Sequence, residues 1–378
     1  MSFFYALLGF LSYLRLVRLN KNKKVIFFSE SKNYRNYLLN LIKILGKENN
    51  LSVIYLTSDL NDLKEIPNKI NPIYIGAGFF RILIFTFIEC EMLIMTLTDL
   101  GNHEIKRSKN CKNYVYLFHS LVSTHKLYTH KAFENYDIIL SNGEYQKREL
   151  EICEKLFKFK KKKIFNTGYI YLEHLIENKI HNINSSDEKK ILVALSWNKS
   201  AKNLFDDYAE NIIKKLIDEK FHAILRIHPE TLKRSNRALK NIKKNLLKFN
   251  NFELNTDLTN LKPINDSSLL ITDNGGMALE YFIAQKKPVL YINYSEKIHN
   301  EFLEKIDLPT VEDRFKEDVG TAMQIDQLNE LKLFIKKTKD NFNKNKEKIN
   351  SLVLDNKIVL KNQSQNSKRI ILELLFKN

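Results

Sequence analysis

Short runs of apolar residues alternate along this chain with longer segments in which apolar residues recur at helical spacing. The runs predicted as strands are residues 25–28, 51–56, 72–75, 92–95, 114–118, 137–140, 191–195, 222–227, 268–272 and 288–292. Helices are predicted between them, for example over residues 36–45, 204–218 and 277–284. Because strands that alternate with helices build βαβ units, the pattern predicts an α/β protein with parallel sheets covered on both faces.

A polar stretch without an apolar period, residues 178–190, divides this pattern into two halves. The chain has 378 residues, a length that suits two domains. We therefore expect two Rossmann-like domains facing across a cleft, over residues 21–180 and 190–350. A helical tail over residues 351–378 follows, and we expect its last helix to fold back onto the first domain. Ligands of such sheets bind at the carboxyl ends of strands, so residues that follow strands are the candidates for function.

Residues 1–20 have the composition of an amphipathic helix. Aromatic and aliphatic residues fill the run to Leu14, and Arg15 and Arg18 follow it. The run is shorter than the roughly 20 residues of a membrane span, and it lacks the basic start and the cleavage site of a signal peptide. It predicts a helix on a membrane surface with its arginines toward anionic headgroups, or alternatively a helix packed on the protein's own core.

A second apolar stretch, residues 79–97, contains Arg81, Glu89 and Glu91. Charges at the centre of a bilayer are costly, so this stretch is predicted to be a buried helix followed by a buried strand rather than a membrane span.

The overall charge is +17, from 61 Lys and Arg against 44 Asp and Glu. A surface this basic attracts nucleic acid, anionic lipid or phosphorylated substrates, and charge alone does not choose among them. The three cysteines are widely spaced and form no CxxC pair, which argues against a disulfide framework or a zinc site and favours a reducing cytoplasm.

Three groups of polar residues follow predicted strands. The first is His119 with Ser120, where the histidine suits a general base, or else a structural role. His125 and His130 are weaker candidates, expected on the surface of the following helix. The second group is Arg226 and His228, which strand alternation places on one side as a possible phosphate clamp; a strand-end ion pair is the alternative.

The third group is the turn from Thr272 through Asp273, Asn274, Gly275 and Gly276. Its glycines allow a ligand to approach the backbone, and a helix N-terminus after it suits a pyrophosphate; a plain tight turn is the alternative.

Two further side chains are candidates near these groups. Glu280 lies one turn into the helix after the glycines and could hold a ribose hydroxyl, while Trp197 follows a strand in a possible substrate loop or has a packing role. No GxxxxGK[ST], GxGxxG, GxSxG, HExxH or DxD motif occurs, so we expect neither a P-loop, a dinucleotide fingerprint, nor an essential metal or other cofactor.

Taken in order, these segments resemble the CDP-glycerol glycerophosphotransferase family of teichoic-acid and capsule polymerases. The matching segments are His119, Tyr136–Ser141, Thr167–Tyr169, Leu195–Trp197, Arg226–Pro229, Ile271–Gly276 and Lys287–Val289. The resemblance implies a GT-B-like fold and peripheral attachment to the inner face of the cell membrane. It also implies that His119 acts as base, that Arg226 and His228 hold the donor's pyrophosphate, and that the 272–276 turn stabilises the departing nucleotide.

The chain departs from that family's pattern at three places. The family's aspartate after the Thr167–Tyr169 segment has no clear counterpart here, and Glu173 is the nearest carboxylate. Ser120 stands where the family has glycine, and Gly275 and Gly276 replace a pair of serines. The turn is also similar to the Thr-Asp-Ser-Gly-Gly of UDP-N-acetylglucosamine 2-epimerases. The expected function is therefore transfer of a glycerol-phosphate or related group from a CDP-alcohol to a cell-surface polysaccharide or lipid-linked acceptor. The alternatives are an enzyme that uses a nucleotide sugar, or a non-catalytic basic protein that binds membrane or nucleic acid; we expect no nucleic-acid partner.

Overall fold

The computed structural model describes residues 2–19, 23–67, 70–101, 105–180, 189–198 and 202–376. The chain forms two compact units. Unit 1 comprises residues 1–119, 129–174 and 358–378, and unit 2 comprises residues 120–128 and 175–357. The chain therefore passes into unit 2 directly after His119 and returns at Thr129. Most of the predicted polar boundary, residues 181–188, lies outside the described residues.

Unit 1 is built on a seven-stranded parallel sheet with the order β3-β2-β1-β4-β5-β6-β7. Its strands are β1 (Lys23–Ser29), β2 (Leu51–Thr57), β3 (Asn71–Tyr74), β4 (Cys90–Met95), β5 (Cys111–Leu117), β6 (Ile138–Ser141) and β7 (Lys163–Asn166). The central strands are buried on both faces, as a parallel sheet between helices requires.

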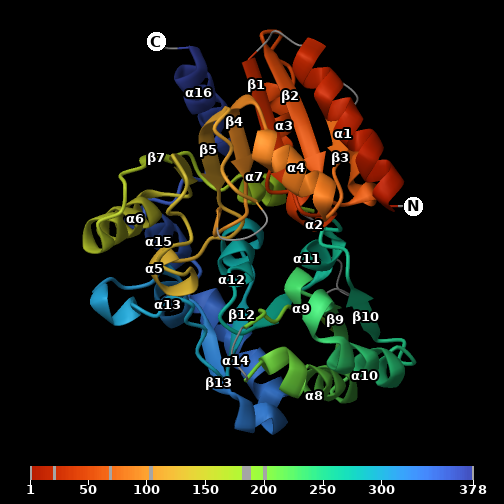
Figure 1. Ribbon diagram of the computed structural model, residues 1–378. Helices are drawn as coiled ribbons and strands as arrows, with labels where there is room; N and C mark the ends of the chain where they lie inside the picture. The colour runs from red at the N-terminus through yellow and green to blue at the C-terminus, as the bar shows by residue number, and fades with distance from the viewer. Residues whose placement is uncertain are drawn as a thin grey trace. The chain divides into compact units, whose positions relative to one another are not determined.

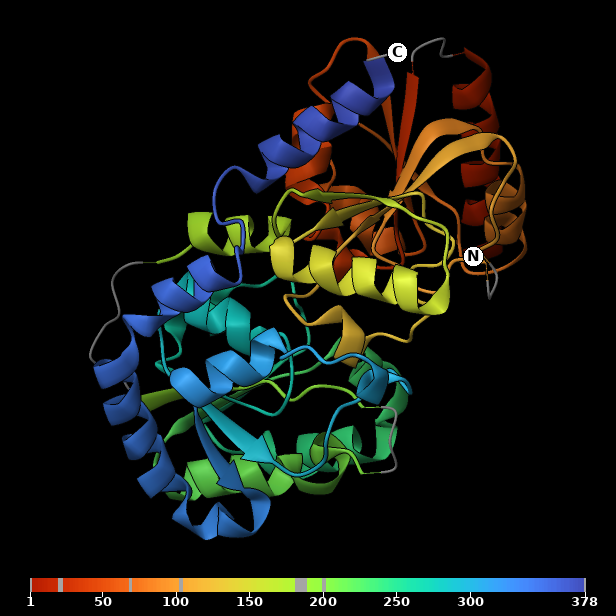
Figure 2. The same cartoon turned by 90° about the vertical axis from the view of Figure 1, so that its left-hand side faces the viewer.

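Helices cover both faces of this sheet. Figure 2 shows α16 (Gln363–Phe376, blue) and α1 (Ser2–Leu19, dark red) on opposite sides of it. Phe27 and alternate residues of the neighbouring strands pack with α3 (Leu39–Leu45) and α16. Phe28 points the other way and meets Phe85 of α4 (Phe79–Phe87), with ring centroids 4.9 Å apart. The remaining helical segments of unit 1 are α2 (Lys32–Arg35), η1 (Leu60–Glu65) and α6 (Glu144–Phe157), and α7 (Ile170–Glu177) contains the division between the units.

Unit 2 is built on a six-stranded parallel sheet with the order β10-β9-β8-β11-β12-β13. Figure 1 labels β9, β10, β12 and β13 of this sheet. Its strands are β8 (Lys190–Val193), β9 (His222–Arg226), β10 (Phe252–Asn255), β11 (Leu269–Thr272), β12 (Val289–Asn293) and β13 (Thr321–Gln324). The strand order reverses between β8 and β11, so the two loops after these strands diverge to opposite faces. In doubly wound sheets this switch point is where ligands bind.

The described helical segments of unit 2 are α5 (Thr124–Leu127), α8 (Leu204–Asp218), α9 (Pro229–Arg234), α10 (Asn236–Leu246), α11 (Lys262–Asp266), α12 (Met277–Glu280), η3 (Tyr281–Gln285), η4 (Leu303–Lys305), α13 (Val311–Asp318), η5 (Ile325–Glu330), α14 (Leu331–Asn345) and α15 (Lys348–Asp355). Five of these segments, α8, α9, α10, η5 and α14, pack an apolar core on one face of the unit 2 sheet.

The predicted α/β class with two parallel sheets is confirmed, and every predicted strand is present. Three strands were not predicted: β7, β10 and β13. Each lies at the edge of its sheet and carries polar, partly exposed residues in place of an apolar run. Of the buried helix and buried strand predicted over residues 79–97, the strand is confirmed as β4. The helix prediction is wrong for one face of α4, because Phe79, Ile82 and Phe87 are exposed.

Candidate functional site

The turn after β11 is joined to the loop after β8 at the switch point of unit 2. Thr272 is fully buried, and its hydroxyl donates to the Ala194 carbonyl at 2.7 Å. The Asp273 carboxylate accepts from both the backbone N–H and the hydroxyl of Ser196, at 2.8 and 2.7 Å. These side chains therefore hold the two loops together and fix the backbone that follows each strand.

A lysine that the sequence analysis did not single out acts electrostatically on this carboxyl group. Burial raises the pKa of Asp273, and Lys297 and the Ser196 hydrogen bonds oppose that rise. Burial lowers the pKa of Lys297, and Asp273 and Glu312 oppose that fall. Lys297 follows β12, so it lies at the same edge of the sheet. Its position after a predicted strand was the signal that could have found it.

The glycine pair lies where side chains would not fit. A Cβ atom on Gly276 would overlap the Ser120 hydroxyl and lie 3.0 Å from Val122 Cγ1, while one on Gly275 would lie 3.3 Å from Ser196 Cβ. Gly276 is the N-cap of α12, which continues into the π-helical turn η3. The backbone between Asp273 and α12 is thus closely packed by Ser120 and Ser196.

Residues 120–128, which follow β5, belong to unit 2 and form hydrogen bonds with it. Ser123 N donates to Glu312 at 2.9 Å, and its hydroxyl accepts from Val311 N at 2.8 Å. Lys126 forms an ion pair with Asp313 at 2.9 Å. The expectation that His125 lies on a helix surface is wrong, because it is fully buried and its Nε2 lies 3.1 Å from the Leu308 carbonyl.

The loop after β12 meets the other two loops. Asn274 Nδ2 donates to the Ser295 carbonyl and Asn198 Nδ2 to the Glu296 carbonyl, both at 3.3 Å. Lys316 of α13 donates to Asn293 Oδ1 at 2.7 Å and lies 5.3 Å from the centre of the Tyr291 ring. Burial lowers the pKa of Lys316, and the carboxylates of Asp313 and Asp273 oppose that fall.

Arg226 is buried, and its guanidinium organises the loop after β10. Nη1 donates to Asn255 Oδ1 at 2.9 Å and to the Asn260 carbonyl at 3.0 Å, and Nη2 donates to the Leu258 carbonyl at 2.8 Å. Three N–H donors are thereby used within the protein. Strand alternation did not reveal this use, because the acceptors belong to a segment about thirty residues later in the chain.

His228 is the N-cap of α9, and its Nδ1 accepts from the Glu230 backbone N–H at 3.2 Å. This bond requires an unprotonated Nδ1 and so assigns the ring proton of the neutral side chain to Nε2. Near it, the Arg234 guanidinium lies 5.2 Å from the centre of the Trp197 ring. The Trp197 ring also meets His299 edge-on at 6.4 Å, so this side chain is half-buried between two elements of unit 2.

His119 follows β5 as the last residue of the first part of unit 1. Its Nδ1 lies 3.3 Å from the hydroxyl of Tyr116. The rings of Tyr34 and Tyr37 meet it edge-on at 6.1 and 5.9 Å. This aromatic surround holds the imidazole in one orientation and leaves it half-buried.

The structure thus brings most of the predicted residues to one edge of one sheet. Nine of them lie at the carboxyl edge of the unit 2 sheet, at strand ends, in the loops that follow, or in segments that pack on those loops. They are Ser120, Trp197, Arg226, His228, Thr272, Asp273, Asn274, Gly275 and Gly276. Glu280 is buried at the end of α12, and His119 belongs to unit 1.

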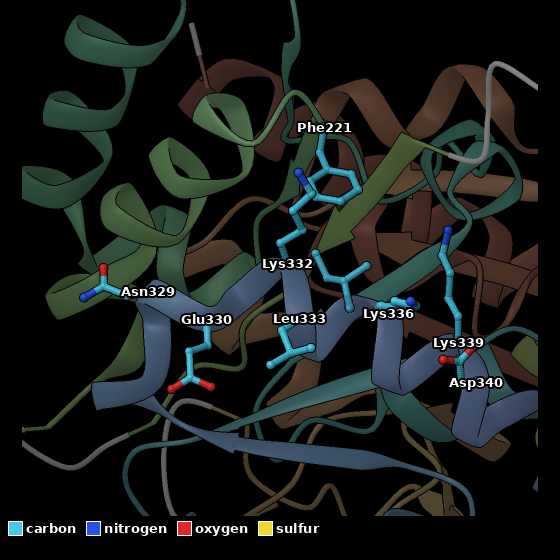
Figure 3. Close-up of a pocket in the computed structure, with 9 residues that line it drawn as sticks. Phe221, Asn329, Glu330, Lys332, Leu333, Lys336, Lys339 and Asp340 are labelled. Atoms are coloured by element: carbon cyan, nitrogen blue, oxygen red, sulfur yellow. The ribbon is translucent and has the colours of Figure 1, made fainter.

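A hollow on unit 2 lies apart from these residues. It has a volume of about 660 Å³ and is lined mainly by η5 and α14, with Phe221 just before β9 (Figure 3). Phe221 precedes the amino end of that strand, whereas Arg226 lies at its carboxyl end. None of the predicted site residues lines it. Among the described residues, no cluster of three His, Cys, Asp or Glu side chains could hold a metal ion.

No family model and no curated protein matches the chain. Solved structures do match over nearly its whole length. The wall teichoic acid polymerase TagF superposes with a TM-score of 0.58 and 16% identity, covering 97% of each chain. A putative UDP-N-acetylglucosamine 2-epimerase from Listeria monocytogenes gives a TM-score of 0.59 at 14% identity, covering 94% of this chain and 98% of its own.

A further match is the UDP-GlcNAc 2-epimerase of Methanocaldococcus jannaschii in complex with UDP-GlcNAc and UDP. It gives a TM-score of 0.59 at 16% identity and covers 92% of this chain and 99% of its own. These similarities show the GT-B-like fold that the ordered motifs predicted, and they include a teichoic-acid polymerase, as the sequence resemblance did.

Proposed function

We propose that this chain is a transferase that moves a glycerol-phosphate or related group from a CDP-alcohol to a cell-surface polysaccharide or lipid-linked acceptor. The observation that carries the proposal is the bridge between Ser196 and Asp273 at the switch point of unit 2. Such an edge, with a tightly packed glycine pair beside it, is where doubly wound sheets bind nucleotides. TagF, one of the similar structures, was also solved with CDPG.

Each group then has a role in the proposed reaction. An acceptor hydroxyl attacks the phosphorus that carries the glycerol, the bond to the CMP oxygen breaks, and CMP leaves. His119 takes the hydroxyl proton at Nε2, which requires Nδ1 to carry the ring proton and donate to Tyr116 Oη. The His228 Nε2–H, assigned by the bond at Nδ1, donates to a donor phosphate oxygen.

The remaining site residues hold the donor and its leaving group. Backbone N–H groups of the 272–276 turn and the cation of Lys297 stabilise the charge that develops on the departing CMP. Glu280 and Trp197 bind the nucleoside. Arg226 supports the donor site by fixing the 255–260 loop, and its remaining N–H donors serve the pyrophosphate.

A second candidate keeps the same site and changes the donor to a nucleotide sugar. The glycine pair favours it, because the turn lacks the two serine hydroxyls of the glycerophosphotransferase pattern. Two of the similar structures are 2-epimerases, one of them solved with UDP-GlcNAc and UDP. The first candidate places the protein in the cytoplasm, peripheral on the inner face of the membrane, whereas an epimerase-like form of the second acts freely in solution. Neither has a nucleic-acid partner.

A thermal-shift screen against CDP-glycerol, CDP-ribitol, CMP, UDP and UDP-sugars tests the donor. A ligand at one hundred times its Kd stabilises the folded protein by about 2.7 kcal/mol. We expect the cytidine compounds to raise the melting temperature; a rise with uridine compounds alone favours the nucleotide-sugar candidate.

Point variants test the two histidines. His119→Ala and His228→Ala should abolish transfer while leaving the melting temperature close to that of the parent. His222→Ala is the matched control, because His222 lies at the amino end of β9 whereas His228 follows its carboxyl end. If both site variants keep full turnover, the proposed transferase role is wrong.

A further inference from the structure

One face of α1 is apolar and exposed although the opposite face is packed on the sheet. Ala6, Gly9 and Tyr13 are buried against unit 1, and a Cβ on Gly9 would overlap the Tyr74 carbonyl of β3. The Tyr13 hydroxyl accepts from Glu89 N at 3.0 Å. The exposed side chains are Phe4 (60%), Tyr5 (45%), Leu8 (43%) and Leu11 (52%). They recur at helical spacing, so they form one stripe.

α4 repeats this arrangement. Phe80, Ile84 and Phe85 face the protein, whereas Phe79 (67%), Ile82 (42%) and Phe87 (62%) are exposed. The exposed positions again lie on one helical face. Phe10 of α1 packs on Phe80 of α4 with ring centroids 5.7 Å apart. Figures 1 and 2 show the two helices side by side on the same face of the unit 1 sheet.

The two stripes hold seven of the fifteen exposed large hydrophobic side chains of the described residues. Such a concentration is unusual for a surface that faces only water, where large apolar side chains are normally scattered. None of the described helices is long and apolar enough to cross a bilayer. We infer that α1 and α4 together form a surface that inserts into the interface of an anionic membrane.

Charge decides between a membrane and another protein surface as the occupant. From Met1 to Ser29 the sequence carries five Lys or Arg residues and no Asp or Glu, and four of the five remain once Lys24 is assigned to Glu89. α4 carries Arg81 and no acid. The carboxylates that follow α4 are neutralised in place: Glu89 pairs with Lys24 at 3.1 Å and Glu91 with Lys112 at 2.9 Å. An apolar stripe rich in phenylalanine with basic surroundings matches anionic headgroups above acyl chains.

This inference rests on the peripheral membrane contact proposed above and extends it from residues 1–20 to α4. Deleting α1 is a poor test, because it also removes the packing of Gly9 on β3 and the bond from Glu89 N to the Tyr13 hydroxyl, so a loss of binding could not be told from a loss of folding. Substitution of exposed side chains is sharper, since these side chains make few contacts in the folded protein.

The experiment is flotation of the full chain with vesicles of phosphatidylglycerol and phosphatidylcholine, or of phosphatidylcholine alone. Two double variants are compared with the parent: Phe79→Ser with Phe87→Ser in α4, and Phe4→Ser with Leu8→Ser in α1. The matched control is Leu333→Ser with Leu354→Ser, which removes two exposed leucines from unit 2. Melting curves and size-exclusion chromatography with light scattering accompany every variant.

We expect the parent to bind the anionic vesicles at least tenfold more tightly than the neutral ones. Each helix variant should lose at least tenfold of that binding, with the control and the melting temperatures unchanged. Parental binding by the α4 variant overturns the inference, even if the α1 variant is released and the contact of residues 1–20 stands. A parental dimer that the α4 substitutions convert to monomers, without vesicle binding, assigns the surface to a second copy and also overturns it. The thermal-shift screen for the donor uses no vesicles. A failure of the proposed reaction can therefore be distinguished from a failure of membrane binding.

Discussion

The hydroxyl of Ser120 occupies the space into which a side chain at Gly276 would project. In the glycerophosphotransferase pattern the residue after the histidine is glycine and the turn carries serine. This chain has the two residue types the other way round. The glycine and the serine have therefore changed places between positions 120 and 276. A hydroxyl still lies beside the start of α12, but Ser120 supplies it instead of residue 276. The residue pair belongs together in any test of specificity.

Gly276→Ala should destabilise unit 2 by about 1–3 kcal/mol, because the added methyl group forces Ser120 to move in a packed environment. Ser120→Gly in the same chain should recover part of the loss, since Val122 still lies 3.0 Å from the added atom. Denaturant unfolding of the two single variants and the double variant gives their coupling energy. Gly78→Ala is the control, because a Cβ there meets nothing within 4 Å. Additive effects of the two substitutions would contradict the exchange.

Asp273 should make the folded protein less stable as pH rises through a defined interval. Burial raises its pKa above the ordinary 3.8, so the folded state keeps a proton that the unfolded chain has already lost. Unfolding then releases a proton, and stability falls from pH 3.8 upward until the folded carboxyl has ionised. Asp273→Asn cannot ionise and should flatten this part of the curve. Melting temperatures of both proteins over this range check it; parallel curves would show that the shift is absent.

Lys297 should make nucleotide binding weaken at a lower pH than an ordinary lysine would. Burial lowers its pKa below 10.5, and the loss of its proton removes a positive charge from the proposed phosphate site. Calorimetric titration of CDP or UDP between neutral and alkaline pH measures the affinity. Lys297→Met should bind less tightly at neutral pH and show a flatter profile. Lys305→Met is the control, because Lys305 lies over the Phe302 ring in η4.

Arg226→Lys should destabilise unit 2 by about 2–4 kcal/mol, because one ammonium group cannot replace a planar guanidinium that bonds Asn255, Asn260 and Leu258. Donor affinity should fall with it as the 255–260 loop loosens. Asn255→Ala, which removes an acceptor without touching the arginine, separates the two roles. If it weakens donor binding as Arg226→Lys does, Arg226 acts through the loop; if donor binding survives, the arginine contacts the donor directly.

Arg35 and Asp62 form a buried ion pair of 2.8 Å in unit 1, and Tyr55 and Thr57 also donate to the carboxylate. Removing one partner leaves a charge in the protein interior. Asp62→Ala should therefore cost about 3–5 kcal/mol of stability. Arg35→Met with Asp62→Leu should recover much of it, because no charge is left unpaired. Chemical denaturation measures both, and equal losses in the single and double variants would argue against a charge penalty.

The central strands and the α/β class were readable because an apolar run or a helical period is a local property of the sequence. Three of the four edge strands, β7, β10 and β13, were not, since they carry polar, partly exposed residues and become strands only by pairing with a neighbour. The fourth, β3, was predicted from residues 72–75. The exposure of α4 was likewise not predictable from the sequence. The spacing of its apolar residues shows which of them share a helical face, but not whether another element covers that face.

The sequence by itself determined the order of the strand-end motifs and hence the edge of each sheet where function was to be sought. Only the tertiary structure decided which of their side chains already form hydrogen bonds within the protein. Arg226 bonds to a loop about thirty residues later, and Asp273 to Ser196, which precedes it by 77. Ser120 joins a different unit from its neighbour His119. These partners are distant in sequence, and burial and hydrogen bonding between distant segments leave no periodic trace in the chain.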